Sequence, residues 1–465
     1  MMPAPATVPA ADREGPIADR NQPSRSALRR SAGSVRECGP TSQHCLVGSH
    51  SDPTSAEAEG PIADREGPRR NRMAAPPLME TPIAIVDRDR STVEVRRGPS
   101  RSAEVEIITD FNAFLALEAE WNDAVERARI PHPFLRHEWV RTWWDAFSTP
   151  ATRLHIQIVR ANGRVTAIAP FMRDTAAMYG IRARRVRFIH NDHTPRTDII
   201  VADDADASYR AIWRALREDR ERWDVLQLGQ LERDSRTQRV FREFAAADRL
   251  ATGTWRSSDS PYLPITGTWD GYLNGLSAKF RSNLRNRLAR LTKIGNPSLE
   301  VLTDRRAIEA ASEEAYRLES SGWKREAGTA IASDPAVHRF YTALIERGAS
   351  AGWLQLLFLK VGDRRIATSY GACFDHRLFL FKTGYDPEFA TGAPFKILTS
   401  LAIQEACAQG LTEVDFLGDA EPWKLEWTST SRGHDWLYVF GDTMRARLLH
   451  SIKFEWLPEL KKWQT

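Results

Sequence analysis

The sequence has few cysteines, no long apolar run and little net charge. Its four cysteines are Cys38, Cys45, Cys373 and Cys407. Their spacing fits neither a disulfide framework nor a set of metal ligands, so we expect no metal site. No run of about eighteen apolar residues occurs, which argues against a transmembrane segment. The N-terminus also lacks the basic-then-apolar pattern of a secretory signal. These absences favour a reducing, cytoplasmic setting.

Residues 1–104 differ in composition from the rest of the chain. They are rich in Pro, Ala, Ser, Arg and Glu and poor in aromatic residues, which is typical of a disordered leader. The hexapeptide GPIADR occurs at 15–20 and again at 60–65. Two hypotheses remain open: a disordered low-complexity leader, or a wrongly assigned start, with translation beginning at Met73 or Met79.

The remaining length is sufficient for two domains of ordinary size. Helical and strand-like patterns mix from 105 to 266, where Asn162-Gly163 is a strong signal for a two-residue hairpin. A basic helix, predicted at 272–294, occupies the connection 267–297. The second domain spans 298–465. The sequence therefore predicts an α/β (α+β) fold.

The chain is organised around the stretch 354–427. Three apolar runs, 354–361, 365–374 and 377–385, predict antiparallel strands joined by short turns. A periodic run at 395–407 predicts a helix, with Pro394 at its first position, and 412–417 predicts a further strand. A helix start beside a sheet offers backbone N–H groups to a phosphate.

The predicted connecting helix carries a basic face with no acidic residue between 278 and 294. Two interpretations remain open: a solvated surface, or a site for an anion such as a nucleotide-linked acceptor or RNA. The residues proposed to bind an anionic substrate on this helix are Lys279, Arg281 and Arg285. Trp323 and Lys324, in a later loop, are proposed to line the acceptor cleft.

Four motifs occur in a familiar order: KFRSNLR at 279–285, SGWK at 321–324, GYDPEFA at 384–390 and DFLGDAEPWK at 415–424. This order resembles the GNAT-superfamily acyltransferases of the CelD/BcsL (cellulose-biosynthesis) type, which are related to the FemAB transferases. The resemblance implies two tandem GNAT-like domains, each a mixed central sheet flanked by helices. It also implies transfer of an acyl group from acyl-CoA to an amine or hydroxyl, with no permanently bound cofactor.

The resemblance also assigns site residues. The turn expected to hold the CoA pyrophosphate consists of Thr391, Gly392, Ala393, Phe395 and Lys396. The intervening Pro394 removes one backbone donor, which differs from the glycine-rich pattern of GNAT enzymes.

Acyl transfer needs a base for the nucleophile, an oxyanion stabiliser and an acid for the leaving thiolate. The catalytic candidates are Tyr385 as acid, Asp415 and Glu421 as bases, and Lys424 as a cationic stabiliser. The cluster 190–193 (HNDH) has no third residue spaced for a metal ligand, so we interpret it as a loop.

The expected acceptor is a small or sugar-linked molecule of envelope or exopolysaccharide metabolism. Two alternatives remain open. One is a FemAB-like transferase that uses aminoacyl-tRNA as donor, with tRNA on the basic helix. The other is a non-catalytic binding module that retains the fold.

Overall fold

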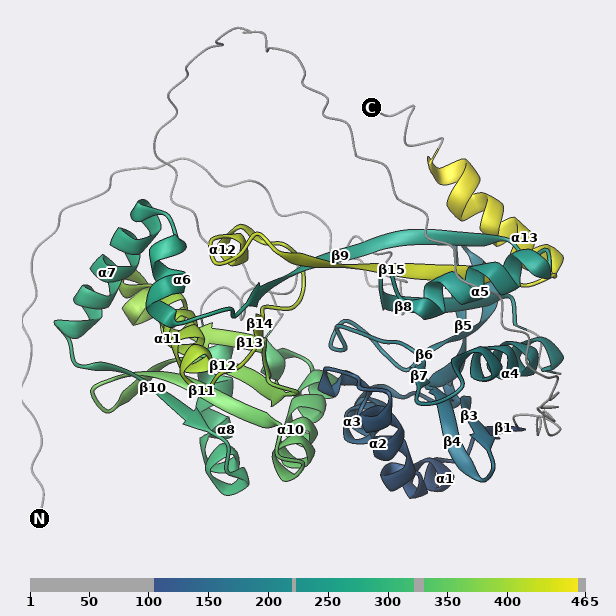
Figure 1. The fold of residues 1–465 in the computed structure, drawn as a ribbon, viewed down its shortest axis with the longest axis horizontal. Helices are drawn as coiled ribbons and strands as arrows, with labels where there is room; N and C mark the ends of the chain where they lie inside the picture. Colours follow the sequence, from purple (N-terminus) through teal and green to yellow (C-terminus); the bar gives the residue numbers. More distant parts are fainter. Residues whose placement is uncertain (1–103, 220–222, 322–329, 459–465) are drawn as a thin grey trace, which may run out of the picture. The chain divides into compact units, whose positions relative to one another are not determined.

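The computed structural model describes residues 104–219, 223–321 and 330–458, which all belong to one compact unit of the chain. Strands form two sheets, one of four strands and one of eleven, with helices packed against them (Figure 1). Parallel and antiparallel neighbours both occur in the larger sheet. The predicted α/β class, with a mixed sheet flanked by helices, is confirmed.

The smaller sheet is antiparallel throughout. Its strands, in spatial order, are β1 (Glu104–Ile108), β3 (Ile156–Ala161), β4 (Arg164–Ala169) and β7 (Ile200–Val201). Asn162 and Gly163 join β3 to β4 with φ values of 53° and 77°. Two successive positive φ angles match the right-handed twist of the flanking strands. The predicted hairpin is confirmed.

The larger sheet contains the predicted meander. Its strands, in spatial order, are β10 (Pro297–Leu302), β11 (Leu354–Val361), β12 (Arg364–Phe374), β13 (Arg377–Tyr385), β14 (Glu413–Asp415), β9 (Thr252–Pro264), β15 (Ser431–Phe440), β8 (Val225–Glu232), β6 (Ile181–Phe188), β5 (Phe171–Met178) and β2 (Arg153–Leu154). Strands β11, β12 and β13 pair antiparallel, as predicted. The strand predicted at 412–417 is shorter, because the chain leaves the sheet after Asp415.

The helices pack on both sheets. They are α1 (Phe111–Ala116), α2 (Glu118–Arg127), α3 (His137–Phe147), α4 (Ala205–Glu218), α5 (Arg236–Ala247), α6 (Trp269–Gly275), α7 (Ala278–Thr292), α8 (Arg305–Glu319), α10 (Pro335–Ser350), α11 (Pro394–Ala408), α12 (Pro422–Leu425) and α13 (Met444–His450). Helix α11 begins at Pro394, as predicted. The single helix predicted at 272–294 is wrong: Ser277 caps α7 by accepting a hydrogen bond from the Phe280 N–H, which separates α7 from α6.

The same order of elements occurs twice along the chain. A strand, helices, antiparallel strands, a long helix and a further strand run from β1 to β8 and again from β10 to β14. The strand that follows each series pairs with the other series: β9 lies against β14, and β15 lies against β8. Strands β9 and β15 also pair with each other and run side by side (Figure 1). Each series therefore completes the sheet of the other.

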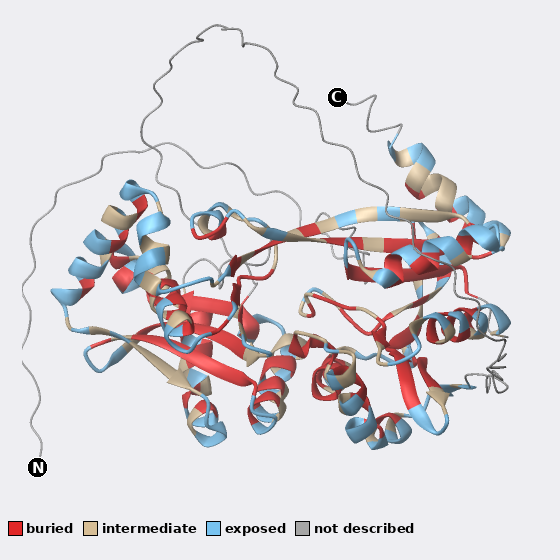
Figure 2. Ribbon diagram, in the orientation of Figure 1, coloured by how far each residue is buried: buried red, intermediate tan, exposed pale blue. Residues whose placement is uncertain are grey.

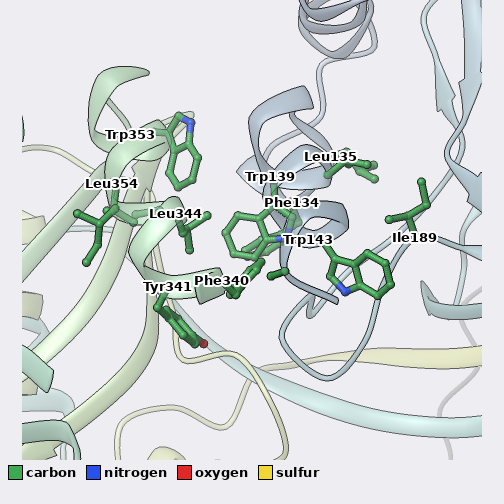
Figure 3. Close-up of a cluster of buried hydrophobic side chains, with 14 of the residues drawn as sticks. Phe134, Leu135, Trp139, Trp143, Ile189, Phe340, Tyr341, Leu344, Trp353 and Leu354 are labelled. Carbon is green, nitrogen blue, oxygen red and sulfur yellow. The ribbon is translucent and has the colours of Figure 1, made fainter. Parts of the chain in front are cut away.

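A buried aromatic cluster joins α3 to α10 (Figure 3). The ring of Trp139 in α3 meets Phe340 in α10 edge-on, with centroids 5.7 Å apart. The indole N–H of Trp353 donates to the Glu138 carboxylate over 3.1 Å. Helices α8 and α10 each contain both buried and exposed residues (Figure 2), and their buried apolar residues belong to this core. This core holds α3 and α10 together, and both helices line the candidate site described in the next subsection.

Gly384 in β13 provides a test of how closely helix α8 packs on the sheet. A Cβ added there would lie 2.3 Å from the Cα of Glu319 and 2.4 Å from the carbonyl oxygen of Leu318, both in the α8 backbone. We expect Gly384→Ala to lower the free energy of unfolding by about 1–3 kcal/mol or more, because backbone cannot move aside cheaply. Urea denaturation measures this change. Gly275→Ala is the matched control, since nothing lies within 4 Å of its added Cβ; equal stability of the two variants would contradict the packing.

Candidate active site between diverging strands

Strands β13 and β14 pair for only part of their length. Their parallel pairing covers Arg377–Phe379 and Glu413–Asp415. Beyond this pairing, β13 continues to Tyr385. The segment that follows β14 turns away from it through Leu417 and Gly418, whose φ values are 53° and 61°. A β-bulge adds one residue to β13 at 381–382, opposite β12. The two strands therefore diverge, and this end of the sheet is open.

A cavity of about 80 Å³ lies at this opening. Its wall includes Trp139, Asp192, His193, Phe381, Asp419 and His434. Five segments far apart in the sequence thus supply these six residues. The hydroxyl of Ser260, also in the wall, has no hydrogen-bond partner among the described residues. The space is sufficient for several water molecules, and therefore for a small reacting group.

A cluster of buried charges underlies the cavity. Asp415 is fully buried and accepts hydrogen bonds from the guanidinium groups of Arg196 and Arg432. Arg432 also pairs with Glu413 over 3.0 Å, and Arg196 donates to the imidazole of His434 over 3.3 Å. Burial raises the pKa of Asp415, but the two arginines outweigh it, so this pKa lies below its ordinary value. Asp415 therefore stays ionised.

The same charge cluster holds in place the strained loop 416–421, here called the wall loop, which joins β14 to α12. The second carboxylate oxygen of Asp415 accepts the Leu417 N–H over 2.9 Å. From the other side, the buried ammonium of Lys424 donates to the carbonyl oxygens of Leu417 and Asp419 over 2.7 and 2.9 Å, and pairs with Glu421 over 3.0 Å. Burial lowers the pKa of Lys424 and raises that of Glu421. The loop is thus fixed by charged groups at both ends.

Burial shifts the pKa of two titratable groups of the wall. Burial raises the pKa of Asp192, although the nearby Lys382 ammonium opposes this. Asp192 nevertheless keeps an exposed surface, so its pKa is shifted less than that of His193. Burial, aided by Lys382, lowers the pKa of His193 to about 3, so its imidazole is neutral at pH 7. The Tyr341 hydroxyl lies 3.5 Å from its Nδ1.

The predicted catalytic residues lie beside the cavity rather than in its lining. Asp415, Glu421 and Lys424 are brought together around the wall loop. Tyr385 ends β13, half-buried, and its carbonyl oxygen accepts a hydrogen bond from the Ser321 hydroxyl. Their catalytic roles remain predictions.

The sequence interpretation missed Asp192 and His193, which it assigned to a plain loop. The density of His and Asp within 190–193 was the available signal.

The predicted phosphate turn, 391–396, contacts the basic helix. Arg287 and Arg290 of α7 donate to the carbonyl oxygen of Thr391 over 3.3 and 3.0 Å. Ala393 has a φ of 46° just before α11. Lys396 pairs with Glu426 over 2.6 Å. Two guanidinium groups therefore lie next to the helix start, and neither had been singled out from the sequence.

The residues predicted to bind an anionic substrate are not gathered at this turn. Arg281 donates to the carbonyl oxygens of Asn274 and Leu276. Lys279 and Arg285 are exposed on α7. Trp323 and Lys324 lie outside the described residues.

Residues 278–425 match the family model of an acetyltransferase (GNAT) domain. The match runs from α7 to α12 and includes the phosphate turn, the strand opening and the wall loop. This segment is therefore similar to the acetyltransferase domains of the GNAT type. No curated protein sequence matches the chain significantly.

Three solved structures resemble the chain over most of its length. FemX is 13% identical, with 75% of this chain and 99% of that chain covered and a TM-score of 0.49. A conserved protein of unknown function from Bacteroides thetaiotaomicron is 13% identical, with 73% and 100% covered and a TM-score of 0.45. A tandem GNAT protein from the clavulanic acid biosynthesis pathway is 15% identical, with 73% and 100% covered and a TM-score of 0.38. At such scores, no function is inferred from these likenesses.

Two further features of the described ranges bear on function. No group of three or more His, Cys, Asp or Glu residues there is arranged to hold a metal ion. No helix within those ranges combines the length and apolarity needed to cross a bilayer.

Asp415→Asn tests the charge cluster. It leaves Arg196 buried beside a neutral amide, so we expect a loss of about 3–5 kcal/mol in the free energy of unfolding at pH 7. Because the pKa of Asp415 is depressed in the folded state, its contribution is complete above the ordinary value of 3.8 and disappears as pH falls through the folded value. The difference between wild type and variant should therefore shrink below about pH 4.

Urea denaturation at pH 7 and at acid pH measures this difference. Asp259→Asn is the control, because its ion pairs with Arg256 and Arg233 are partly exposed and should each contribute less than about 1 kcal/mol. Equal losses of unfolding free energy in the two variants would show that the Asp415 cluster contributes no more to stability than a partly exposed ion pair.

Proposed function

We propose that this chain is an acyltransferase that moves an acyl group, such as acetyl, from acyl-CoA to an amine or hydroxyl. The observation that supports this most strongly is the position of the cavity. It lies where β13 and β14 diverge, and Tyr341, Phe381 and the residues 417–419 of its wall belong to the segment that matches the acetyltransferase family. A thioester entering through that opening would reach the wall groups directly.

The donor phosphates are proposed to bind at the turn Thr391, Gly392, Ala393, Phe395 and Lys396. The start of α11 provides the positive end of a helix dipole. Arg287 and Arg290 add two charges at the same place. The residues present therefore fit a diphosphate, even though Pro394 removes one N–H. The β13 bulge interrupts regular pairing beside the cavity, where a thioester carbonyl would need a hydrogen-bond donor.

Asp192 is the proposed general base. The nucleophilic nitrogen or oxygen of the acceptor attacks the thioester carbon, and its proton passes to the Asp192 carboxylate. The C–S bond then breaks, and the CoA thiolate takes a proton from a tyrosine hydroxyl. Tyr385 was predicted for this role, and Tyr341 lies in the cavity wall. A raised carboxylate pKa suits the base, because it brings proton affinity closer to neutral pH.

We further propose the finer identity that the motif order suggests. The chain would be a CelD/BcsL-type enzyme of two tandem GNAT-like domains, 105–266 and 298–465, joined through 267–297. The repeated order of elements supports this division. The acceptor would be a small or sugar-linked molecule of envelope or exopolysaccharide metabolism in the cytoplasm.

A second candidate function is FemAB-like transfer from aminoacyl-tRNA. The observation that favours it is α7, which carries six basic and no acidic residues within 278–293. Salt-dependent tRNA binding, lost when Lys279 and Arg285 are reversed in charge, would favour this candidate.

Titration calorimetry of the full chain with CoA tests the donor site. We expect micromolar binding that Arg287→Glu/Arg290→Glu weakens at least tenfold, because each charge-assisted hydrogen bond contributes about 1.5–3 kcal/mol. Arg285→Glu is the matched control on the same helix, as Arg285 makes no hydrogen bond to the turn within the described structure. No binding by folded wild type would count against an acyl-CoA donor.

Asp192→Asn tests the base. With acetyl-CoA and a panel of amines and amino sugars, thiol release should fall in kcat/KM by about 10²–10⁴. In wild type, the rate should decline toward acid pH with an apparent pKa above the ordinary 3.8 of an aspartate, and the variant should lack that decline. Asp192→Glu should recover part of the rate. An unchanged pH profile in Asp192→Asn, with the exposed Asp234→Asn as control, would exclude this role.

A further inference from the structure

The last helical segment of the chain exposes apolar side chains at every fourth position. Met444 is 87% exposed, Leu448 41% and Trp456 53%, with Ile452 between them half-buried. These four residues, here called the outer stripe, lie on α13 and on the π-helical turn Ser451–Trp456 that continues it. Residues spaced by four share one face of a helix. Single exposed apolar residues are ordinary, but a continuous row marks a contact surface.

The opposite face of this segment is firmly anchored. Lys453 is 6% exposed, and its ammonium lies 4.6 Å from the centre of the Tyr438 ring and 4.8 Å from that of Trp255. The Phe454 ring sits where a Cβ at Gly253 would approach within 2.3 Å. Because this face is held by aromatic contacts and a cation, the helix cannot roll to hide the outer stripe.

The charge of the segment indicates what covers the outer stripe. Of the five basic residues within 444–465, Lys453 is buried on the opposite face and Arg445 pairs with Asp224. The other three are Arg447, Lys461 and Lys462, and Trp463 follows the two lysines in the sequence. Basic residues beside exposed apolar and tryptophan side chains are typical of helices that lie on anionic bilayers. Tryptophan in particular favours the boundary between headgroups and acyl chains.

Size argues against two other arrangements: an interface with a second copy of the chain, and a helix that spans the membrane. The outer stripe consists of four side chains, one of them half-buried, whereas a stable protein interface takes roughly 800 Å² and about 20–30 residues per partner. A second copy of the chain is therefore a poor match. The segment Met444–Trp456 combines helices of 7 and 6 residues, whereas crossing a bilayer takes about 20. It can lie on a membrane but cannot span one.

We propose that the outer stripe binds the surface of an anionic phospholipid bilayer. The segment lies parallel to the membrane, with Met444, Leu448 and Trp456 below the headgroups. Arg447, which is exposed beside them, meets the lipid phosphates. This binding does not depend on acyl transfer.

Sedimentation of the full chain with vesicles tests the proposal. Vesicles of phosphatidylcholine with about 30% phosphatidylglycerol should retain the protein far better than phosphatidylcholine alone, and added salt should weaken retention. Met444→Ser/Leu448→Ser should lower partitioning at least tenfold, because two side chains lose their apolar burial. Thermal unfolding should be unchanged, since both residues are exposed.

Leu288→Ser/Ile294→Ser is the matched control. These residues are 37% and 66% exposed on or just after the basic helix α7, so the variant removes a similar apolar surface near more positive charge. Retention that this control abolishes and the outer-stripe variant does not would overturn the proposal. So would absence of vesicle binding by wild type, or self-association that the outer-stripe variant abolishes.

Discussion

Asp415 and Arg196 are both almost completely buried, and neither could carry its charge there alone. They lie 219 positions apart in sequence, in the two series of elements that share the large sheet. Desolvating two ions costs more than a single pair usually returns, so the cluster requires its further partners, Arg432 and His434. Since Asp415 also binds the Leu417 N–H, one set of charges both joins the two series and shapes the cavity wall.

The same burial sets the chemistry of the wall. Removing water raises the pKa of a carboxyl group and lowers that of an imidazole. Asp192 therefore gains proton affinity, while His193 and His434, whose pKa values both fall to about 3, remain neutral. A cavity that held many ionised groups would resist desolvation when a substrate enters. Here Asp415, Arg196 and Arg432 lie beneath the wall and pair with one another, and Lys424 is engaged in holding the loop.

Local patterns in the sequence predicted local structure well. Asn162-Gly163 specifies its hairpin, Pro394 specifies a helix start, and apolar runs specify β11 to β13, because each depends on neighbouring residues. Strand β9 was missed, since its polar stretch around Ser257 and Ser258 lacks apolar alternation. The cavity was missed for a different reason: Asp192 and Asp419 line one cavity although they lie far apart in sequence, and no local pattern encodes such long-range packing.

The paired strands β9 and β15 also connect the cavity to the C-terminal segment. Strand β9 carries Ser258 and Ser260 in the cavity wall and Gly253 beneath Phe454. Strand β15 likewise runs from His434 to Tyr438 and Phe440, which pack under the last helix. At about 3.3 Å per residue, five to seven strand residues span roughly 20 Å. Paired strands of that length are stiff, so a membrane-bound outer stripe would hold the cavity at a nearly constant distance from the lipid headgroups.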